Sequence, residues 1–342
     1  MIVKAAVRNF KLLLFFKKLI RRRNILTIIQ YIASRYIYKR KVPQIFYVAL
    51  TYDCQFQCYY CGSASYPRDN RELSIRDWKK IIDQLSEMKV PEVEFSGGEP
   101  LLNDCLEELV YYASGRGLVT VISTNGWALT EDRIDRLKEC GVNCICISLD
   151  GASPEVHDNI CLKKGSFQRV IKAIELCRQK RICCVISTIL RRELIASFEF
   201  EKLLLLIEDM GANGIRLVSP LAVGRWLGED EQILTVEEKD KARDAVRRHA
   251  VPVIGRGFNY GVCGATTNYS AYISPSAEVQ PCGYIPYSFG NATQEIMAPI
   301  LQRISSHEMF KKRGRCRIED PGFRNTYLRG LRSNTGLPVK LY

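Results

Sequence analysis

The chain has 342 residues, 46% hydrophobic and 25% charged, so it can bury the core of a large domain plus an appendage, and its composition excludes a disordered or low-complexity protein. Its 14 cysteines lack the short, evenly spaced pattern of a secreted disulfide scaffold, which favours a reducing cytoplasm. The net charge of +13 lies at one end, because residues 1–41 hold twelve Lys or Arg and no Asp or Glu, and the rest of the chain nets only +1. The basicity therefore belongs to an N-terminal segment and not to the body.

This N-terminal segment has the apolar periodicity of an amphipathic helix over residues 8–32. Its longest uncharged apolar run is five residues, too short to cross a bilayer, and no small-residue cleavage site follows as in a signal peptide. Three interpretations remain open: the helix lies on an anionic membrane surface, it packs on the body or a partner, or it binds nucleic acid. Nucleic-acid binding has the least support, because no nucleic-acid-binding motif accompanies the charge. The predicted apolar face consists of Leu12, Leu13, Phe16, Leu19 and Ile20.

Beyond Pro43, short apolar runs alternate with helical stretches. Strands are predicted at 45–50, 93–95, 119–122, 144–149, 183–190 and 215–218, and helices near 74–89, 103–114, 130–140, 166–180 and 198–210. Strands that are apolar on both faces and alternate with helices indicate an α/β fold with a parallel sheet, open or barrel-like. In such folds ligands gather at the carboxyl ends of the strands.

Three cysteines follow the first strand at the spacing C-x3-C-x2-C: Cys54, Cys58 and Cys61. A short loop brings their thiolates to one point, which suits a soft metal centre. A zinc site would need a fourth Cys or His nearby, whereas the nearest His is His157 and the next Cys is Cys105. Three ligands and an open position suit an iron–sulfur cluster that leaves one iron for a substrate.

Polar and glycine-rich segments end the following strands. The second strand ends in Gly97-Gly98-Glu99-Pro100, where glycines let backbone groups approach a ligand and the Glu99 carboxylate could meet an ammonium group. The third ends in a segment with Ser123 and Asn125, and the fourth in one with Ser148 and Asp150. Turn chemistry alone would also explain these residues.

The cysteine spacing, followed by the GGEP segment, resembles the signature of the radical S-adenosylmethionine (radical SAM) family. The resemblance implies a partial (βα)6 TIM-like barrel, a 4Fe–4S cluster on Cys54, Cys58 and Cys61, and SAM bound to the fourth iron. It also implies that Tyr60 lies against the adenine. The other SAM-binding positions that it implies are Gly97, Gly98, Glu99, Pro100, Ser123, Asn125, Ser148, Asp150 and Arg191.

One position departs from the relatives' usual pattern. After Asp150 they usually read His-Asp-x-x-Arg-Gly, and here Cys161 stands at the arginine position. Any role of that arginine is therefore in doubt. Cys161 could be an active-site thiol, although a structural cysteine is the favoured interpretation.

The C-terminal part brings further cysteines in loops: Cys263, Cys282 and Cys316, with a predicted hairpin over 272–282. This part resembles the SPASM and twitch extensions of radical SAM enzymes, which hold auxiliary 4Fe–4S clusters. A full SPASM domain has about seven cysteines, so three support at most one auxiliary cluster. The alternative is an extension without a cluster. The predicted domains are a basic helical segment (1–42), the barrel (43–225), a helical bridge (226–257) and the extension (258–342).

The resemblance implies an enzyme that reductively cleaves SAM to a 5′-deoxyadenosyl radical, which takes hydrogen from a peptide or small-metabolite substrate. It also implies an external one-electron donor of the flavodoxin or ferredoxin type. One 4Fe–4S cluster is expected, and a second if the C-terminal cysteines hold the auxiliary cluster. A lipid or lipid-linked substrate at the membrane surface is the second interpretation. A non-catalytic iron–sulfur electron carrier is the alternative from another class. The expected location is the cytoplasm, with residues 1–41 available to an anionic membrane surface.

Overall fold

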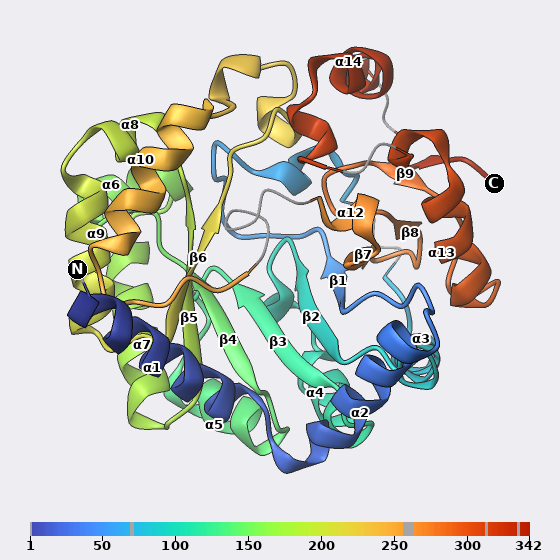
Figure 1. Ribbon diagram of the computed structural model, residues 1–342, viewed down its shortest axis with the longest axis horizontal. Helices are drawn as coiled ribbons and strands as arrows, with labels where there is room; N and C mark the ends of the chain where they lie inside the picture. The colour runs from blue at the N-terminus through green and yellow to red at the C-terminus, as the bar shows by residue number, and fades with distance from the viewer. Residues whose placement is uncertain (1, 69–71, 256–262, 312–313, 334–335) are drawn as a thin grey trace.

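The computed structural model describes residues 2–68, 72–255, 263–311, 314–333 and 336–342, with a central sheet flanked by helices (Figure 1). The sheet has eight strands in the order β6-β5-β4-β3-β2-β1-β7-β8, parallel except for the antiparallel pair β7–β8. The strands are β1 (Ile45–Thr51), β2 (Glu92–Gly97), β3 (Val119–Thr124), β4 (Cys144–Ser148), β5 (Cys183–Ile189), β6 (Gly214–Val218), β7 (Ser270–Ile273) and β8 (Val279–Gln280).

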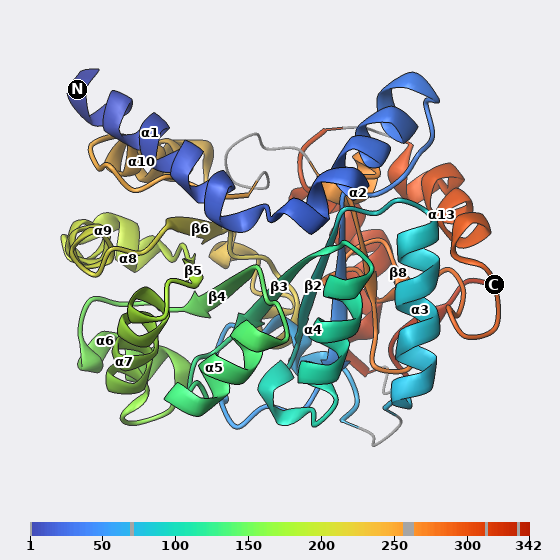
Figure 2. The ribbon, with the colours of Figure 1, turned by 90° about the horizontal axis from the view of Figure 1, so that it is seen from below.

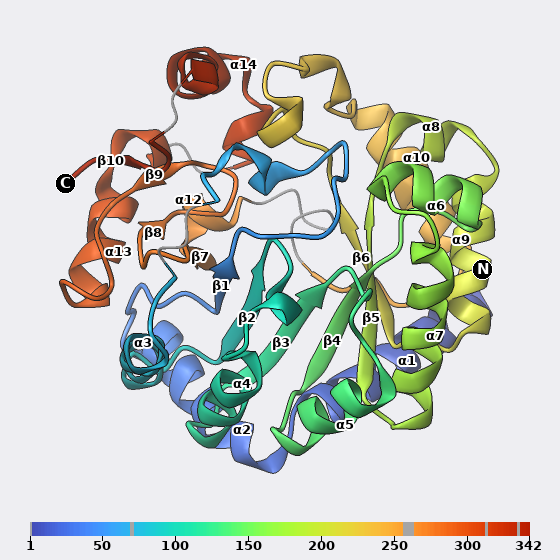
Figure 3. The same ribbon diagram turned by 180° about the vertical axis from the view of Figure 1, so that it is seen from behind.

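All six predicted barrel strands are present, and their parallel pairing confirms the α/β class. Each is followed by helical structure, and Figure 3 shows these helices over one face of the sheet, called here the outer face. The helices are α3 (Ile75–Glu87), α4 (Leu106–Gly115), α5 (Glu131–Glu139), α6 (Pro154–Cys161), α7 (Ser166–Gln179), α8 (Arg192–Ala196) and α9 (Glu199–Asp209). The short helices α6 and α8 were not predicted, because neither is long enough to show an apolar period.

Local signals set the helix ends. The Ser74 hydroxyl accepts a hydrogen bond from the Asp77 amide and caps α3, whose side chains Trp78 and Ile81 are buried. Gly141, which follows α5, has a φ of +90°, a conformation that favours glycine at a helix end. These caps explain why the predicted boundaries lie within a few residues of the observed ones.

The N-terminal segment forms two helices rather than the single predicted one, α1 (Ile2–Leu19) and α2 (Arg22–Ile32), followed by a π-helical turn (Ala33–Ile37). Figure 2 shows α1 and α2 on the opposite side of the sheet from α3, α4 and α5. Phe15 is buried there in an apolar cluster on the inner face of the sheet. The cluster's other buried members are Val119, Val121, Cys144, Cys146, Cys183 and Val185.

The predicted apolar face of this segment is therefore wrong in part. Phe15, which was outside that face, is 3% exposed, whereas Leu13 and Phe16 are 69% and 46% exposed. Leu12 and Leu19 pack on the inner-face cluster as expected. Apolar residues occur around most of α1, so periodicity alone could not select the buried face.

The C-terminal part adds two strands to the main sheet. The predicted hairpin is present as β7–β8, but β7 pairs in parallel with β1 from Ile45↔Ser270 to Val48↔Ile273. A parallel pairing across such a sequence separation leaves no local signal. The remaining elements are α10 (Val236–Arg247), α12 (Gly264–Thr267), α13 (Met297–Ser306), α14 (Pro321–Phe323) and the parallel pair β9 (Tyr287–Ser288) and β10 (Val339–Lys340).

Candidate active site at the carboxyl ends of the strands

The loops after β1 and β2 touch through their backbones. The Gly98 amide donates to the Thr51 carbonyl oxygen at 2.7 Å, and the Glu99 amide donates to that of Asp53 at 2.8 Å. A Cβ atom on Gly98 would lie 2.1 Å from the Asp53 oxygen. Gly98 of the GGEP segment is therefore required because the cysteine loop approaches so closely. This reason holds with or without a bound ligand.

Glu99 ties the loops after β2 and β3 together. Its carboxylate accepts hydrogen bonds from the Thr124 hydroxyl at 2.7 Å, the Asn125 amide at 2.8 Å and the Leu101 amide at 3.1 Å. The side chain is fully buried, and burial raises the pKa of Glu99 to about 7 despite these hydrogen bonds. Oε2 accepts only one of the three bonds, so it retains capacity for another donor. Pro100, also buried, begins the 3-10 turn that follows.

Asn125 connects this network to the first cysteine. Its Nδ2 lies 3.7 Å from the Cys54 Sγ, and its Oδ1 accepts hydrogen bonds from the Gln55 side chain at 3.3 Å and from the Trp127 amide at 2.9 Å. A side-chain amide thus links a sulfur of the cysteine loop to the end of β3. Sequence reasoning missed Gln55, which lies between Cys54 and Cys58 at a position that the spacing C-x3-C leaves open.

Tyr60 and Asp150 are paired across the site. The Tyr60 hydroxyl donates to Asp150 Oδ2 at 2.6 Å, while Oδ1 accepts from the Ile189 amide at 2.9 Å. Burial, with the adjacent Asp150 charge, raises the pKa of Tyr60 well above its ordinary value. Arg191 donates to the Asp150 carbonyl oxygen at 3.3 Å. Three predicted site residues, from the ends of β1, β4 and β5, therefore lie together.

Ser123 and Ser148 occupy different surroundings. The Ser123 hydroxyl donates to Glu94, and Glu94 forms an ion pair with Arg216, whose Nη2 lies 2.9 Å from Oε2. Ser123 is therefore engaged with a buried ion pair on the inner face, and its expected contact with SAM stays a prediction. Ser148 lies half-buried at the end of β4, in register with Ser187 of β5. A charged residue within an apolar strand pattern is the signal that could have found Glu94 and Arg216.

The cysteine loop is held by backbone contacts on two sides. The amides of Gln57 and Tyr59 donate to the carbonyl oxygens of Cys161 and Ile160, at the end of α6. On the other side the Arg225 amide donates to the Cys61 carbonyl oxygen at 3.1 Å. The loop that carries the three thiols is therefore fixed by α6 and by the segment after β6.

Burial raises the pKa of the Cys54 and Cys58 thiols. The neighbouring Cys61 thiol raises both of these pKa values further. All 14 cysteines of the chain are free thiols. In the described part of the chain, no group of three or more His, Cys, Asp or Glu side chains has a ready-made metal-binding arrangement. Cys54, Cys58 and Cys61 lie in one loop after β1, and both their convergence on one point and their role as cluster ligands stay predictions.

The surroundings fit a polar ligand next to these thiols. Gln55 Oε1 and Arg191 Nε are buried without a hydrogen-bond partner among the described residues, and so is His157 Nε2. Buried polar atoms are rarely left unpaired in native proteins, so such atoms indicate groups that a ligand would satisfy. Together with three thiolate donors, they are compatible with an iron–sulfur cluster and a polar cosubstrate.

Cys161 has the contacts of a structural cysteine. Its thiol donates to the His157 carbonyl oxygen at 2.8 Å and lies 3.2 Å from the Ser166 hydroxyl. It is 2% exposed, and burial raises the pKa of this thiol to about 11. A buried, protonated thiol held in this way supports the favoured interpretation.

The three C-terminal cysteines lie close together in space. Cys263 and Cys316 share a hydrogen bond between their thiols, which lowers the pKa of Cys263 and raises that of Cys316. Burial, followed by the neighbouring Cys263, raises the pKa of Cys282 to about 12. The fold thus gathers thiols that are 53 residues apart in sequence, which supports the auxiliary site without showing a cluster.

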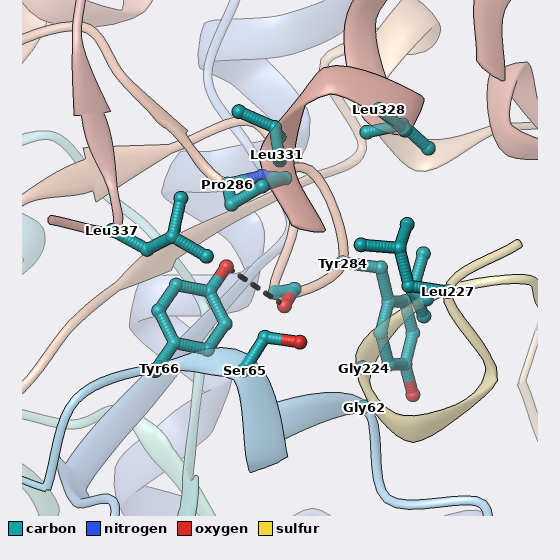
Figure 4. Close-up of a pocket in the computed structure, with 12 residues that line it drawn as sticks. Gly62, Ser65, Tyr66, Gly224, Leu227, Tyr284, Pro286, Leu328, Leu331 and Leu337 are labelled. Carbon is teal, nitrogen blue, oxygen red and sulfur yellow. Dashed lines mark hydrogen bonds between the residues drawn. The ribbon is translucent and has the colours of Figure 1, made fainter. Parts of the chain in front are cut away.

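An apolar pocket lies between the cysteine loop and the C-terminal part (Figure 4). Gly62, next to Cys61, and Gly224 line it on one side, and Leu328, Leu331 and Leu337 line it on the other. The Tyr66 hydroxyl donates to the Gly283 carbonyl oxygen at 3.3 Å and bridges the two parts. The C-terminal residues therefore reach the cysteine loop.

Comparison with known proteins agrees with this geometry. Residues 48–203 match the model of the radical SAM superfamily. These residues form a radical SAM domain. The match contains the cysteine loop, the GGEP segment and Asp150, and proteins of this superfamily are enzymes, so the interpretation as a non-catalytic electron carrier is set aside. The match ends before the C-terminal part, whose SPASM/twitch-like character stays a prediction.

Several curated proteins are similar to this radical SAM enzyme. An AdoMet-dependent heme synthase of Oleidesulfovibrio alaskensis is 26% identical over 295 residues, 77% of this chain and 75% of that protein. One of Methanosarcina barkeri is 25% identical over 313 residues, 81% of this chain and 88% of that protein. The mycofactocin maturase MftC of Mycolicibacterium smegmatis is 41% identical over 126 residues, 37% of this chain and 32% of that protein.

Solved structures confirm the fold. Streptococcus suis SuiB bound to precursor peptide SuiA has a TM-score of 0.64 at 15% identity, covering 81% of this chain and 70% of that chain. The structure of anSMEcpe with bound AdoMet and Cp18Cys peptide has a TM-score of 0.60 at 17% identity, covering 79% of this chain and 83% of that chain. At these identities the likeness shows the partial TIM barrel alone.

Proposed function

We propose that this radical SAM enzyme reductively cleaves SAM and directs the resulting radical to a C–H bond of a peptide or small metabolite. The observation that carries the proposal is Asn125, whose side chain contacts Cys54 Sγ while its backbone amide binds Glu99. One residue thereby couples the cysteine loop to the GGEP segment. A protein that only transferred electrons would have no need for this coupling.

The residues that would hold the cofactors are those predicted from the sequence. Cys54, Cys58 and Cys61 would bind the cluster. When bound, a 4Fe–4S cluster supplies one electron to SAM, whose C–S bond breaks to give methionine and a 5′-deoxyadenosyl radical that takes a hydrogen atom from the substrate. An external donor of the flavodoxin or ferredoxin type would supply that electron.

Around the cluster loop, the chain's own groups would position SAM. The free capacity of Glu99 Oε2 suits an ammonium group, and the unpaired Nε of Arg191 suits a carboxylate. Tyr60 is held by Asp150 with its ring near Trp226, an apolar surface for the adenine. The remaining implied contacts, from Gly97, Gly98, Pro100, Ser123 and Ser148, are part of the same proposal.

The substrate class rests on the relatives and the pocket. Two relatives that cover 77% and 81% of this chain are named for heme synthesis, and one that covers 70% is named PqqA peptide cyclase. The shorter, more identical match is named for mycofactocin maturation. The apolar lining beside Cys61 favours an apolar group on the substrate. A lipid or lipid-linked substrate is the second candidate, since the basic and apolar residues of the N-terminal segment suit a membrane surface.

The division into segments 1–42, 43–225, 226–257 and 258–342 is part of this proposal, as is a cytoplasmic location. Cys263, Cys282 and Cys316 would hold one auxiliary cluster, which the contact between the thiols of Cys263 and Cys316 supports. Among the described residues, none of the helices has the length and hydropathy needed to span a bilayer.

The test is reductive SAM cleavage. Protein purified without oxygen, reconstituted with iron and sulfide and reduced with dithionite should release methionine and 5′-deoxyadenosine in equal amounts. The triple variant Cys54→Ala/Cys58→Ala/Cys61→Ala should release neither. A matched control, Cys105→Ala/Cys140→Ala, removes two partly exposed cysteines elsewhere and should retain activity. Absence of 5′-deoxyadenosine from the parent protein would contradict the proposed function.

A further inference from the structure

The N-terminal helices pack one face on the body and leave another in water. Phe15 of α1 and Asn24, Thr27 and Tyr31 of α2 are buried against the body. The opposite side, called here the N-terminal outer face, carries large apolar side chains in water. Its most exposed members are Phe10 (61%), Leu13 (69%), Leu26 (64%), Ile29 (57%), Tyr36 (66%) and Ile37 (71%).

These side chains form a series along one side of the molecule. Figure 2 shows α1 and α2 following one another on that side, away from the outer-face helices. Leu13 lies two residues from the buried Phe15, and Leu26 two residues from the buried Asn24, so each points to the far side of its helix. A run of exposed apolar residues over successive elements is unusual for a free surface and marks an interaction site.

The charge around this face has a single sign. Lys17, Lys18 and Arg22 are exposed beside the apolar side chains, and residues 1–41 contain no Asp or Glu. Not every basic residue is available, because Arg23 and Arg35 donate to the carbonyl oxygens of Gly141 and Asn268 in the rest of the chain. Lys17, Lys18 and Arg22 have no hydrogen bond or ion pair to the body among the described residues.

We propose that the N-terminal outer face docks this enzyme on an anionic membrane surface. Apolar side chains in the middle of the face suit the boundary between head groups and acyl chains, and Lys and Arg beside them suit anionic head groups. A second copy of the chain fits less well, because two such faces would bring positive charge against positive charge. A polyanion without an apolar layer, such as nucleic acid, would leave the apolar side chains exposed to water.

The placement of this face sets what docking can do. α2 contacts Gly117 and Leu118, just before β3, and Arg23 binds Gly141, just before β4. These are the amino ends of the strands, whereas the cysteine loop follows the carboxyl end of β1. Docking therefore holds the enzyme at the bilayer without covering the cysteine loop. This inference does not depend on the proposed function.

Point substitutions test it better than removal of residues 1–41, because Phe15 and Asn24 belong to the packed body. The full chain is sedimented with vesicles of phosphatidylglycerol and phosphatidylcholine in equal parts, and with pure phosphatidylcholine vesicles. The parent should bind the anionic vesicles and lose binding as salt is raised. Leu13→Gln/Leu26→Gln/Ile29→Gln and Lys17→Gln/Lys18→Gln/Arg22→Gln should each weaken that binding by about tenfold or more.

The matched control is Tyr111→Gln/Phe198→Gln/Ile296→Gln, which removes side chains 67%, 72% and 69% exposed elsewhere on the surface. It should bind like the parent, and all variants should retain the parent's melting temperature and SAM cleavage. Equal binding of the parent and the apolar triple variant would overturn the inference. So would a parent that ignores anionic vesicles but forms a dimer that the apolar triple variant dissociates, since the face would then join two copies.

Discussion

Inside the barrel, one ion pair links strands that are not neighbours in the sheet. Glu94 of β2 is 1% exposed and binds Arg216 of β6, while Ser123 of β3 donates to the same carboxylate. Burial acts to lower the pKa of Arg216, but Cys146 on β4 and the bonded Glu94 together raise this pKa well above its ordinary value. Polar groups therefore cross the inner face just above the apolar layer that α1 covers.

Removing one partner of this pair should be costly, because it leaves the other charge buried and unpaired. Glu94→Gln is expected to lower the free energy of unfolding by about 3–5 kcal/mol. The double variant Glu94→Gln/Arg216→Gln should lose clearly less than the sum of the two single variants. Urea unfolding of the apo-protein measures both. Lys202→Gln, which breaks the exposed pair with Glu199, is the control and should cost less than about 1 kcal/mol. Additive single losses would mean that the two charges are not coupled.

Among the elements, α2 is attached to the body by several hydrogen bonds of one buried side chain, Asn24, in addition to its other contacts. Asn24 is fully buried, and its amide donates to the carbonyl oxygens of Gly117 and Leu118 at 3.1 and 2.9 Å. Its Oδ1 accepts from the Arg21 amide and from Asn143, at 3.0 and 2.9 Å. These bonds satisfy the backbone before β3 and fix where the N-terminal outer face lies.

Asn24→Leu, which keeps the side-chain size, should therefore destabilise the protein by about 2–4 kcal/mol, since several buried groups lose their partners. The expected sign is a lower melting temperature with early protease cleavage within residues 1–41. Gln30→Leu, a partly buried position in the same helix, should change stability by less than about 0.5 kcal/mol. If Asn24→Leu melts like the parent, α2 is held by its apolar contacts instead.

For the whole molecule, the C-terminal part is joined to the barrel by shared structure. β7 extends the main sheet beside β1, Tyr66 bonds Gly283, and Gln280 donates to the Tyr66 hydroxyl at 2.9 Å. The cysteine loop follows β1, so the C-terminal thiols are held relative to it through one continuous sheet. An auxiliary cluster at Cys282 would thus keep a constant position toward the active site.

Counting iron and sulfide in the reconstituted protein tests that arrangement. The parent should hold about eight irons, and Cys263→Ala/Cys282→Ala/Cys316→Ala about four, as should Cys54→Ala/Cys58→Ala/Cys61→Ala. Because each triple variant removes one site, the two losses should be independent. About four irons in the parent, lost only with the cysteines after β1, would mean a single cluster and three structural C-terminal cysteines.

Local features of the sequence determined the six barrel strands and the longer helices that follow them, because periodicity and caps act over a few residues. Motif spacing, which is equally local, supplied the predicted residues of the site. Tertiary structure decided what depends on distant partners. It buried Phe15 rather than Leu13, paired β7 with β1, and set Ser123 on the Glu94–Arg216 pair. Each of these features depends on contacts with residues that are distant in the sequence, so no short segment of the chain is enough to predict it.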